Sequence, residues 1–177
     1  DIIFINNKPF FKTHSYIKFS ISHSHGHIAI LISKSQSINN LGIDIEIFNK
    51  KSDRIIQKYG SSSEIKWYFK KNNLSQRKKF YISWCSKEAF LKAYGIGVSH
   101  LLEISFIPNK KIFSSSIGKG KIKSFEYKNI FISIFINSSI KDEINNITSY
   151  NFQSDKFRKI KESKFQLNYK VNSIKIL

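Results

Sequence analysis

Residues 80–95, FYISWCSKEAFLKAYG, are the stretch around which the chain is built. Ala, Leu, Lys and Glu are strong helix formers, and neither Gly nor Pro interrupts the run, so the pattern predicts a helix. Ser75 is placed to cap a helix that begins near Gln76. Gly95 stands where such a helix would end in a left-handed turn.

Two charged residues of this helix, Glu88 and Lys92, are four positions apart and share a face, with Trp84 one turn before Glu88. One interpretation is an ordinary Glu–Lys pair on a solvated face, which adds roughly a few tenths of a kcal/mol. The other is that Glu88 acts together with carboxylates upstream in the chain. The helix alone leaves both interpretations open.

The composition is that of a globular protein. Of 177 residues, 41% are hydrophobic and 15% aromatic, which suits one domain or two small lobes. The single cysteine excludes an intrachain disulfide and a cysteine-based zinc site, and we expect a cytoplasmic protein. The chain has no long apolar run, and we expect no signal peptide. The chain contains no Met, so we expect a processed chain or a fragment.

The formal net charge is +18, with 30 Lys and Arg against 12 Asp and Glu. Such a charge usually indicates an anionic partner: nucleic acid, a membrane surface or an acidic protein. Almost all of it is lysine, however, because the only arginines are Arg54, Arg77 and Arg158. Scarce arginine argues against bidentate reading of bases in a DNA groove. A basic nucleic-acid-binding module is therefore the rival interpretation.

Apolar patterns before the helix predict strands that favour a sheet. Residues 41–48 alternate strictly, with isoleucines on one side and acidic residues on the other. The other expected elements are apolar pieces at 2–5 and 10–11 around a turn at Lys8-Pro9, strands at 19–21 and 28–32 around a turn at Gly26, and short helices at 52–59 and 62–69.

After the helix the pattern returns to strands. They are expected at 104–107, 112–115, 121–127 and 129–136, and Lys128-Asn129 would join the last two as a tight hairpin. Residues 138–177 are polar and show no pattern that predicts chemistry. The chain is therefore expected to be α+β, with two groups of strands separated by helices.

Asp44 and Glu46 project from the same face of the strand at 41–48. Two adjacent carboxylates repel each other, and a hard divalent cation relieves that repulsion. Mg²⁺ prefers one or two carboxylates together with water and substrate phosphates. Glu88 would supply a third carboxylate from the helix. The alternative, a solvent-facing acidic pair on a strand edge, stays open.

Three histidines, His23, His25 and His27, alternate in a way that superficially suggests a metal cluster. Gly26 interrupts the strand there, and no further ligand follows at the spacing of a zinc hydrolase. We therefore expect one of the three to contact an anion. Cys85 is expected to pack as a small buried apolar group.

Three motifs follow one another along the chain: Ser22-His23-Ser24, then Gly42-Ile43-Asp44-Ile45-Glu46, then Trp84-Cys85-Ser86-Lys87-Glu88-Ala89 with Lys92-Ala93-Tyr94-Gly95-Ile96-Gly97. Their order and spacing resemble the signature of the 4′-phosphopantetheinyl transferases, most closely the surfactin-synthetase-activating type. The resemblance extends from about Lys8 to about Ile136. It implies a two-lobed pseudosymmetric fold in which residues 1–48 are the remainder of a first lobe, 49–137 a second lobe, and 138–177 an extension of unknown role.

The resemblance implies Mg²⁺-dependent transfer of the phosphopantetheine arm of coenzyme A to a serine of an acyl or peptidyl carrier protein, releasing adenosine 3′,5′-bisphosphate. The residues that match metal-binding carboxylates are Asp44, Glu46 and Glu88, and Glu88 also matches the base for the attacking serine. The residues that match contacts of the coenzyme A phosphates are His23, Lys87 and Lys92. Lys92 is also expected to take part in catalysis. Glu64 falls where the family often has an acidic residue.

One departure from the family concerns the N-terminal segment. Members of the family usually carry a longer segment whose basic residues hold the nucleotide 3′-phosphate, and only Asn7-Lys8-Pro9 resembles its tail. We therefore expect an incomplete first lobe and weak binding of coenzyme A. The alternatives are the nucleic-acid-binding module and a relative that has lost catalysis. The expected partners are coenzyme A and a carrier protein, without membrane or nucleic acid; a monomer is one expectation, and the oligomeric state stays open.

Overall fold

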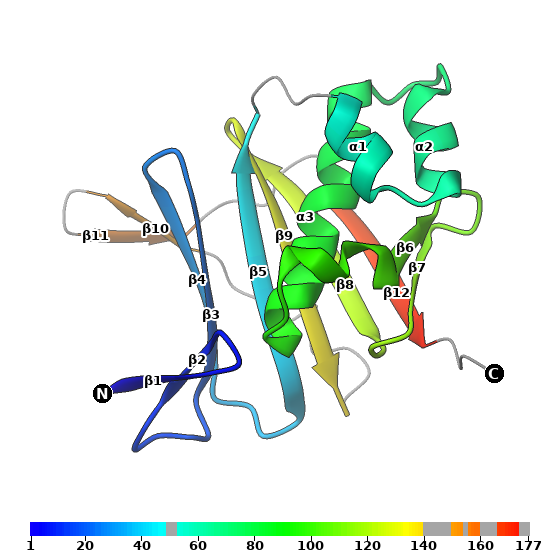
Figure 1. Cartoon of the computed structure of the whole chain (residues 1–177). Helices are drawn as coiled ribbons and strands as arrows, with labels where there is room; N and C mark the ends of the chain where they lie inside the picture. Colours follow the sequence, from blue (N-terminus) through cyan, green and yellow to red (C-terminus); the bar gives the residue numbers. More distant parts are fainter. Residues whose placement is uncertain (49–52, 140–149, 154–155, 160–165, 174–177) are drawn as a thin grey trace.

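A computed structural model describes residues 1–48, 53–139, 150–153, 156–159 and 166–173. The predicted α+β class is confirmed: helix α3 (Gln76–Tyr94) crosses one face of a six-stranded sheet (Figure 1). The strand order is β5-β9-β8-β12-β7-β6. The strands are β5 (Ile38–Ile47), β6 (Ile104–Ile107), β7 (Ile112–Ser115), β8 (Gly120–Tyr127), β9 (Ile130–Ser138) and β12 (Gln166–Ser173). Strands β7 and β12 are parallel, and the other pairs are antiparallel.

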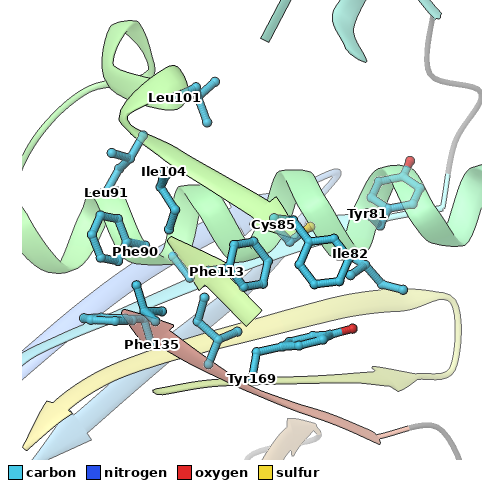
Figure 2. Close-up of a cluster of buried hydrophobic side chains, with 14 of the residues drawn as sticks. Tyr81, Ile82, Cys85, Phe90, Leu91, Leu101, Ile104, Phe113, Phe135 and Tyr169 are labelled. Atoms are coloured by element: carbon cyan, nitrogen blue, oxygen red, sulfur yellow. The ribbon is translucent and has the colours of Figure 1, made fainter. Parts of the chain in front are cut away.

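Helix α3 begins and ends at the predicted caps. The Ser75 side chain accepts a hydrogen bond from the backbone N–H of Lys78, and Gly95 adopts a left-handed conformation with φ of 70°. The side of α3 that faces the sheet is mostly apolar, and its apolar residues pack against others from η1 (Val98–Glu103), β6, β7, β9 and β12 (Figure 2). Burial of this face fixes the helix on the sheet.

Two short helices lie beside α3 (Figure 1). They are α1 (Asp53–Tyr59) and α2 (Ser62–Phe69), close to the predicted bounds. Ser61 caps α2, and Glu64 completes a capping box with it. Ser61 thus directly precedes residue 62, where this helix was expected to begin.

The N-terminal part of the chain forms two hairpins. They are β1 (Ile2–Ile5) with β2 (Lys8–Phe11), and β3 (Lys18–Ser24) with β4 (His27–Ser33). The turn expected at Lys8-Pro9 was wrong. The chain reverses at Asn6 and Asn7, whose φ angles of 48° and 61° lie in the left-handed region that Asn tolerates.

The position of β5 in the sequence suggested that it shares a sheet with β3 and β4. It does not join that hairpin in one hydrogen-bonded sheet. It pairs instead with β9, beyond the helices, so one strand of the first group belongs to the sheet of the second group. A second apolar core lies along β5 and β9, contains Ile43 and Ile45, and includes Leu31 from β4. A division of the chain at residue 48 stays a prediction.

Strand β12 was not predicted. It lies between β8 and β7 in the six-stranded sheet, where it buries Tyr169 and Val171. Part of the segment at 138–177 thus belongs to the main sheet. A further hairpin joins β10 (Tyr150–Gln153) to β11 (Lys156–Lys159), and the rest of that segment after Ser139 lies outside the described residues.

Candidate active site on strand β5 and helix α3

The candidate site depends on a close approach of α3 to β5. Gly42 lies directly beneath the helix, and a Cβ at this position would overlap the Ala89 carbonyl oxygen and lie 2.6 Å from the Ala93 nitrogen. Both clashes are with backbone atoms, which cannot turn aside as a flexible side chain can. The absence of a side chain at Gly42 therefore allows the two elements to meet.

Asp44, two residues further along β5, is buried with 2% of its area exposed. Its Oδ1 accepts hydrogen bonds from the Ser22 hydroxyl at 2.9 Å and from the Lys92 ammonium at 2.6 Å. Burial raises the pKa of Asp44, and the charge of Lys92 opposes that rise. Because Asp44 is buried and paired with Lys92, the interpretation of Asp44 as half of a solvent-facing acidic pair is wrong.

Glu46 follows on the same face of β5 and accepts a hydrogen bond at Oε2 from the Ser24 hydroxyl at 3.0 Å. Ser22 and Ser24 project from one face of β3 toward β5, because alternate residues of a strand share a face. Their hydroxyls also accept hydrogen bonds from the N–H groups of Ile45 and Ile47, at 3.2 and 3.4 Å. The two serines thus accept hydrogen bonds from backbone N–H groups of β5 and donate hydrogen bonds to its two carboxylates.

Glu88 lies on the same side of α3 as Lys92, 3.9 Å from its ammonium, so the predicted pair at four residues' spacing is present. Lys92 also lies 2.6 Å from Asp44, and one ammonium therefore stands between carboxylates of β5 and α3. The buried thiol of Cys85 is close to this group. Burial raises the pKa of the thiol, and the negative charges of Asp44, Glu46 and Glu88 raise it further.

The surroundings of the Asp44 carboxylate indicate whether the acidic side chains of this site suit a divalent cation. Its Oδ2 is buried and accepts no hydrogen bond from a described nitrogen or oxygen donor, while the weakly donating Cys85 thiol lies beside the carboxylate. An orphaned carboxylate oxygen next to Glu46 fits a hard cation. As the side chains stand, no three His, Cys, Asp or Glu residues in the described ranges form a group that could hold a metal ion.

Lys87, predicted to contact a phosphate, is directed away from this site. Its ammonium lies 2.9 Å from Glu64 Oε2, and the two side chains expose 2% and 0% of their area. Burial lowers the pKa of Lys87, and the carboxylate of Glu64 counteracts this. The structure therefore brings Lys87 together with Glu64 rather than with Asp44.

His23 is also separated from the carboxylates. It is exposed and lies on the face of β3 opposite to Ser22 and Ser24. Across the hairpin His23 pairs with Ile28 on that outer face. Its predicted contact with a coenzyme A phosphate stays a prediction from resemblance.

Comparison with known families matches residues 40–140, which contain most of β5 and all of α3, to the model of the 4′-phosphopantetheinyl transferase superfamily. The chain belongs to this superfamily. The match covers more than half of the chain. It confirms the predicted class of enzyme and favours a transferase over the rival nucleic-acid-binding module.

Two curated proteins are similar to the chain. A Haemophilus influenzae protein described as a 4′-phosphopantetheinyl transferase is 26% identical over 170 residues, covering 94% of this chain and 69% of the relative. The holo-[acyl-carrier-protein] synthase of Mycoplasma capricolum is 35% identical over 101 residues, covering 55% of this chain and 83% of the relative. The surfactin-synthetase-activating subtype stays a prediction.

Among solved structures, the holo-[acyl-carrier-protein] synthase of Thermotoga maritima has a TM-score of 0.47 to this chain at 16% identity. The alignment covers 73% of this chain and 85% of that one. None of the described helices is long and apolar enough to cross a membrane.

The roles of the serines of this phosphopantetheinyl transferase did not emerge from its motifs. Ser22 and Ser24 were recognised only as the flanks of His23, yet they are the residues that contact Asp44 and Glu46. Strand alternation was the available signal, because it places both serines opposite to His23. The motif likewise gave no indication that Gly42 shapes the site through its closeness to α3.

Proposed function

We propose that this phosphopantetheinyl transferase moves the 4′-phosphopantetheine arm of coenzyme A to a serine of an acyl or peptidyl carrier protein, with Mg²⁺, and releases adenosine 3′,5′-bisphosphate. The supporting observation is the contact between Lys92 and Asp44 at 2.6 Å, with Glu88 3.9 Å from the same ammonium. It lies within the region that matches the superfamily.

Asp44, Glu46 and Glu88 are the residues that would hold Mg²⁺. The metal supplies Lewis-acid stabilisation of the charge that develops on the phosphates. Asp44 suits this role because its Oδ2 has no nitrogen or oxygen donor among the described residues. Ser22 and Ser24 hold the carboxylates of β5 in place, and this reduces the reorganisation needed before the reaction.

Glu88 is the proposed base. A serine hydroxyl is a poor nucleophile until a neighbouring group accepts its proton, and a carboxylate on α3 near the other two can do so. The side chain of Glu88 is 17% exposed, so it is accessible to a substrate. An Oε atom of Glu88 would accept the proton of the serine hydroxyl.

Lys92 is the proposed pyrophosphate contact. Its side chain is 33% exposed, and its ammonium interacts with Asp44 and Glu88. Breaking a pyrophosphate bond places negative charge on the leaving phosphate, which a nearby ammonium stabilises. Lys92 would therefore contact both the carboxylates of β5 and α3 and the phosphate that gains negative charge in the reaction.

The carrier protein is the proposed protein partner. Carrier proteins are typically acidic, and the net charge of +18 on this chain would speed their encounter. The attraction should weaken as salt is added, because added ions screen exposed charges. Salt dependence of the Michaelis constant for the carrier would measure this contribution.

The proposed function is tested by mixing the protein with coenzyme A, Mg²⁺ and an apo carrier protein and weighing the carrier by intact-mass spectrometry. We expect the carrier to gain the mass of one phosphopantetheine group, and the gain to disappear with EDTA. A carrier whose reactive serine is replaced by alanine is the matched control. An unchanged mass with an active carrier would instead identify a relative that keeps the fold without catalysis.

A further inference from the structure

Helix α3 carries a second charged contact, on a face other than the one that meets β5. Lys87 on α3 and Glu64 on α2 form an ion pair of 2.9 Å that is almost wholly buried. Lys87 also donates to the carbonyl oxygen of Tyr59, the last residue of α1, at 3.0 Å. One ammonium therefore joins three helices that lie together in Figure 1.

The carboxylate of Glu64 holds α3 at two points. Its Oε2 accepts from Lys87 and also from the backbone N–H of Ser61 at 2.7 Å. Its Oε1 accepts from the hydroxyl of Ser83, which lies one turn before Lys87 on the same face of α3. With both oxygens engaged, the contact restricts rotation as well as sliding of the helix.

Helix α2 is itself held to the central sheet. Ser63 donates its hydroxyl proton to the carbonyl oxygen of Phe106 on β6 at 3.0 Å. The rings of Trp67 and Phe106 also pack with their centroids 5.0 Å apart. Glu64 thus lies on a helix that is fixed to the same sheet as Asp44.

Successive residues of an α-helix are rotated by about 100° about the axis. Lys87 directly precedes Glu88, and Lys92 lies one turn beyond it. When Lys87 is held against α2, Glu88 is therefore directed away from α2. Lys92 then lies on the side of α3 where its ammonium contacts Asp44 of β5.

We propose that the buried Glu64–Lys87 pair sets the rotation of α3 and thereby positions Glu88 and Lys92 for phosphopantetheinyl transfer. This inference rests on the proposed function. It makes Lys87 a positioning residue that acts through Glu64, in place of the coenzyme A contact that its motif suggested.

A double-mutant cycle tests this role. Lys87→Met, Glu64→Gln and the double variant are compared with Lys66→Met, which replaces an exposed lysine on α2. We expect kcat to fall at least about tenfold in each single variant, because small displacements of catalytic groups cost up to about 100-fold. Affinity for coenzyme A, measured by calorimetry, should stay within about threefold. The double variant should lose no more than the worse single variant, because both residues act through one contact.

Two results would overturn the proposal. One is a tenfold or greater loss of coenzyme A affinity in Lys87→Met without a similar loss in Glu64→Gln, which would place Lys87 on the substrate. The other is a kcat in all three variants equal to that of Lys66→Met. If a single variant fails to fold, the double variant, which buries no lone charge, is compared with Lys66→Met.

Cys85 provides a readout that does not need transfer activity. It is the single cysteine of the chain, belongs to α3 and has its side chain fully buried in the core beside the helix (Figure 2), so an aromatic disulfide reagent reaches it only when the helix moves. Lys87→Met and Glu64→Gln should speed labelling at least about tenfold over Lys66→Met; equal rates would contradict the proposal. If the wild type transfers nothing, the proposed function fails, and the labelling rates decide the positioning role alone.

Discussion

Lys92 Nζ lies 2.6 Å from Asp44 Oδ1, and this contact links a charged side chain of helix α3 to one of strand β5 at the candidate site. The two residues are 48 positions apart in sequence and come from different kinds of element. Asp44 is almost fully buried, whereas the Lys92 side chain is one-third exposed. The pair therefore has one end fixed in the protein and one end accessible to a ligand.

Replacing Lys92 should impair transfer far more than replacing a lysine elsewhere. We expect Lys92→Ala to lower kcat at least about 100-fold, because it removes the cation that we propose stabilises the developing phosphate charge. Lys58→Ala is the control, because Lys58 is exposed on α1 and contacts the ring of Tyr59. Initial rates at saturating coenzyme A measure both variants. Equal losses would mean that lysines act here only through overall charge.

Gly42→Ala should weaken both folding and transfer. The added methyl group would overlap backbone atoms of Ala89 and Ala93, and overpacking of this kind costs about 1–3 kcal/mol. Gly97→Ala is the matched control, because its nearest neighbour is a side-chain atom 4.0 Å away. Urea unfolding of both variants gives the comparison. A Gly42→Ala protein as stable as Gly97→Ala would show that α3 does not need this close approach.

The β8–β9 hairpin and the central helix were predictable because their signals are local. Ser75 and Gly95 bound α3, and Lys128-Asn129 joins β8 to β9 as expected. Pairing between distant strands leaves no such signal, so the partnership of β5 with β9 was missed. Strand β12 was missed because its residues are mostly polar and only two of the described ones are buried.

The site was predictable in part for the same reason. Spacing placed Glu88 and Lys92 on one face of a helix, and the structure confirms their pairing. It could not reveal that Lys87, next to Glu88, pairs with Glu64, because that contact depends on how α2 packs against α3. Sequence patterns identified the charged residues, whereas tertiary packing decides which of them meet.

Strand β12 should be essential for the fold. Tyr169 packs edge-on against Phe106 and Phe113, with centroids 5.2 and 5.4 Å apart. We expect Tyr169→Ala to lower the free energy of unfolding by about 3–5 kcal/mol, as large aromatic truncations in a core do. Asn168→Ala, at the neighbouring exposed position, should change it by less than about 0.5 kcal/mol. Similar urea midpoints for the two variants would argue that β12 is dispensable.

Stability should depend on pH through Lys8. Burial lowers the pKa of Lys8 from 10.5 to about 8, and the charge of Lys18 adds to the effect. Between these values the unfolded chain holds a proton that the folded chain has lost, so the contribution of Lys8 to the free energy of unfolding rises with pH. Below about pH 8 both states are protonated and this contribution is constant.

The measurement is urea unfolding of the wild type and Lys8→Met from about pH 7.5 to about pH 9.5. The difference in unfolding free energy, wild type minus variant, should increase across this range. Parallel curves would show that Lys8 keeps its proton in the folded protein. Lys8 donates to the Ala93 carbonyl at 2.6 Å, so the variant should also be the less stable protein throughout.

The most direct test of a Mg²⁺-dependent transferase at this site is the initial rate of carrier modification by Asp44→Ala. Removing a proposed oxygen ligand of Mg²⁺ and the partner of Lys92 should lower the rate at least about 100-fold, while circular dichroism confirms a folded protein. Glu103→Ala, which loses only an exposed contact with His100, should retain the wild-type rate. A folded Asp44→Ala protein with unchanged turnover would contradict the proposed site.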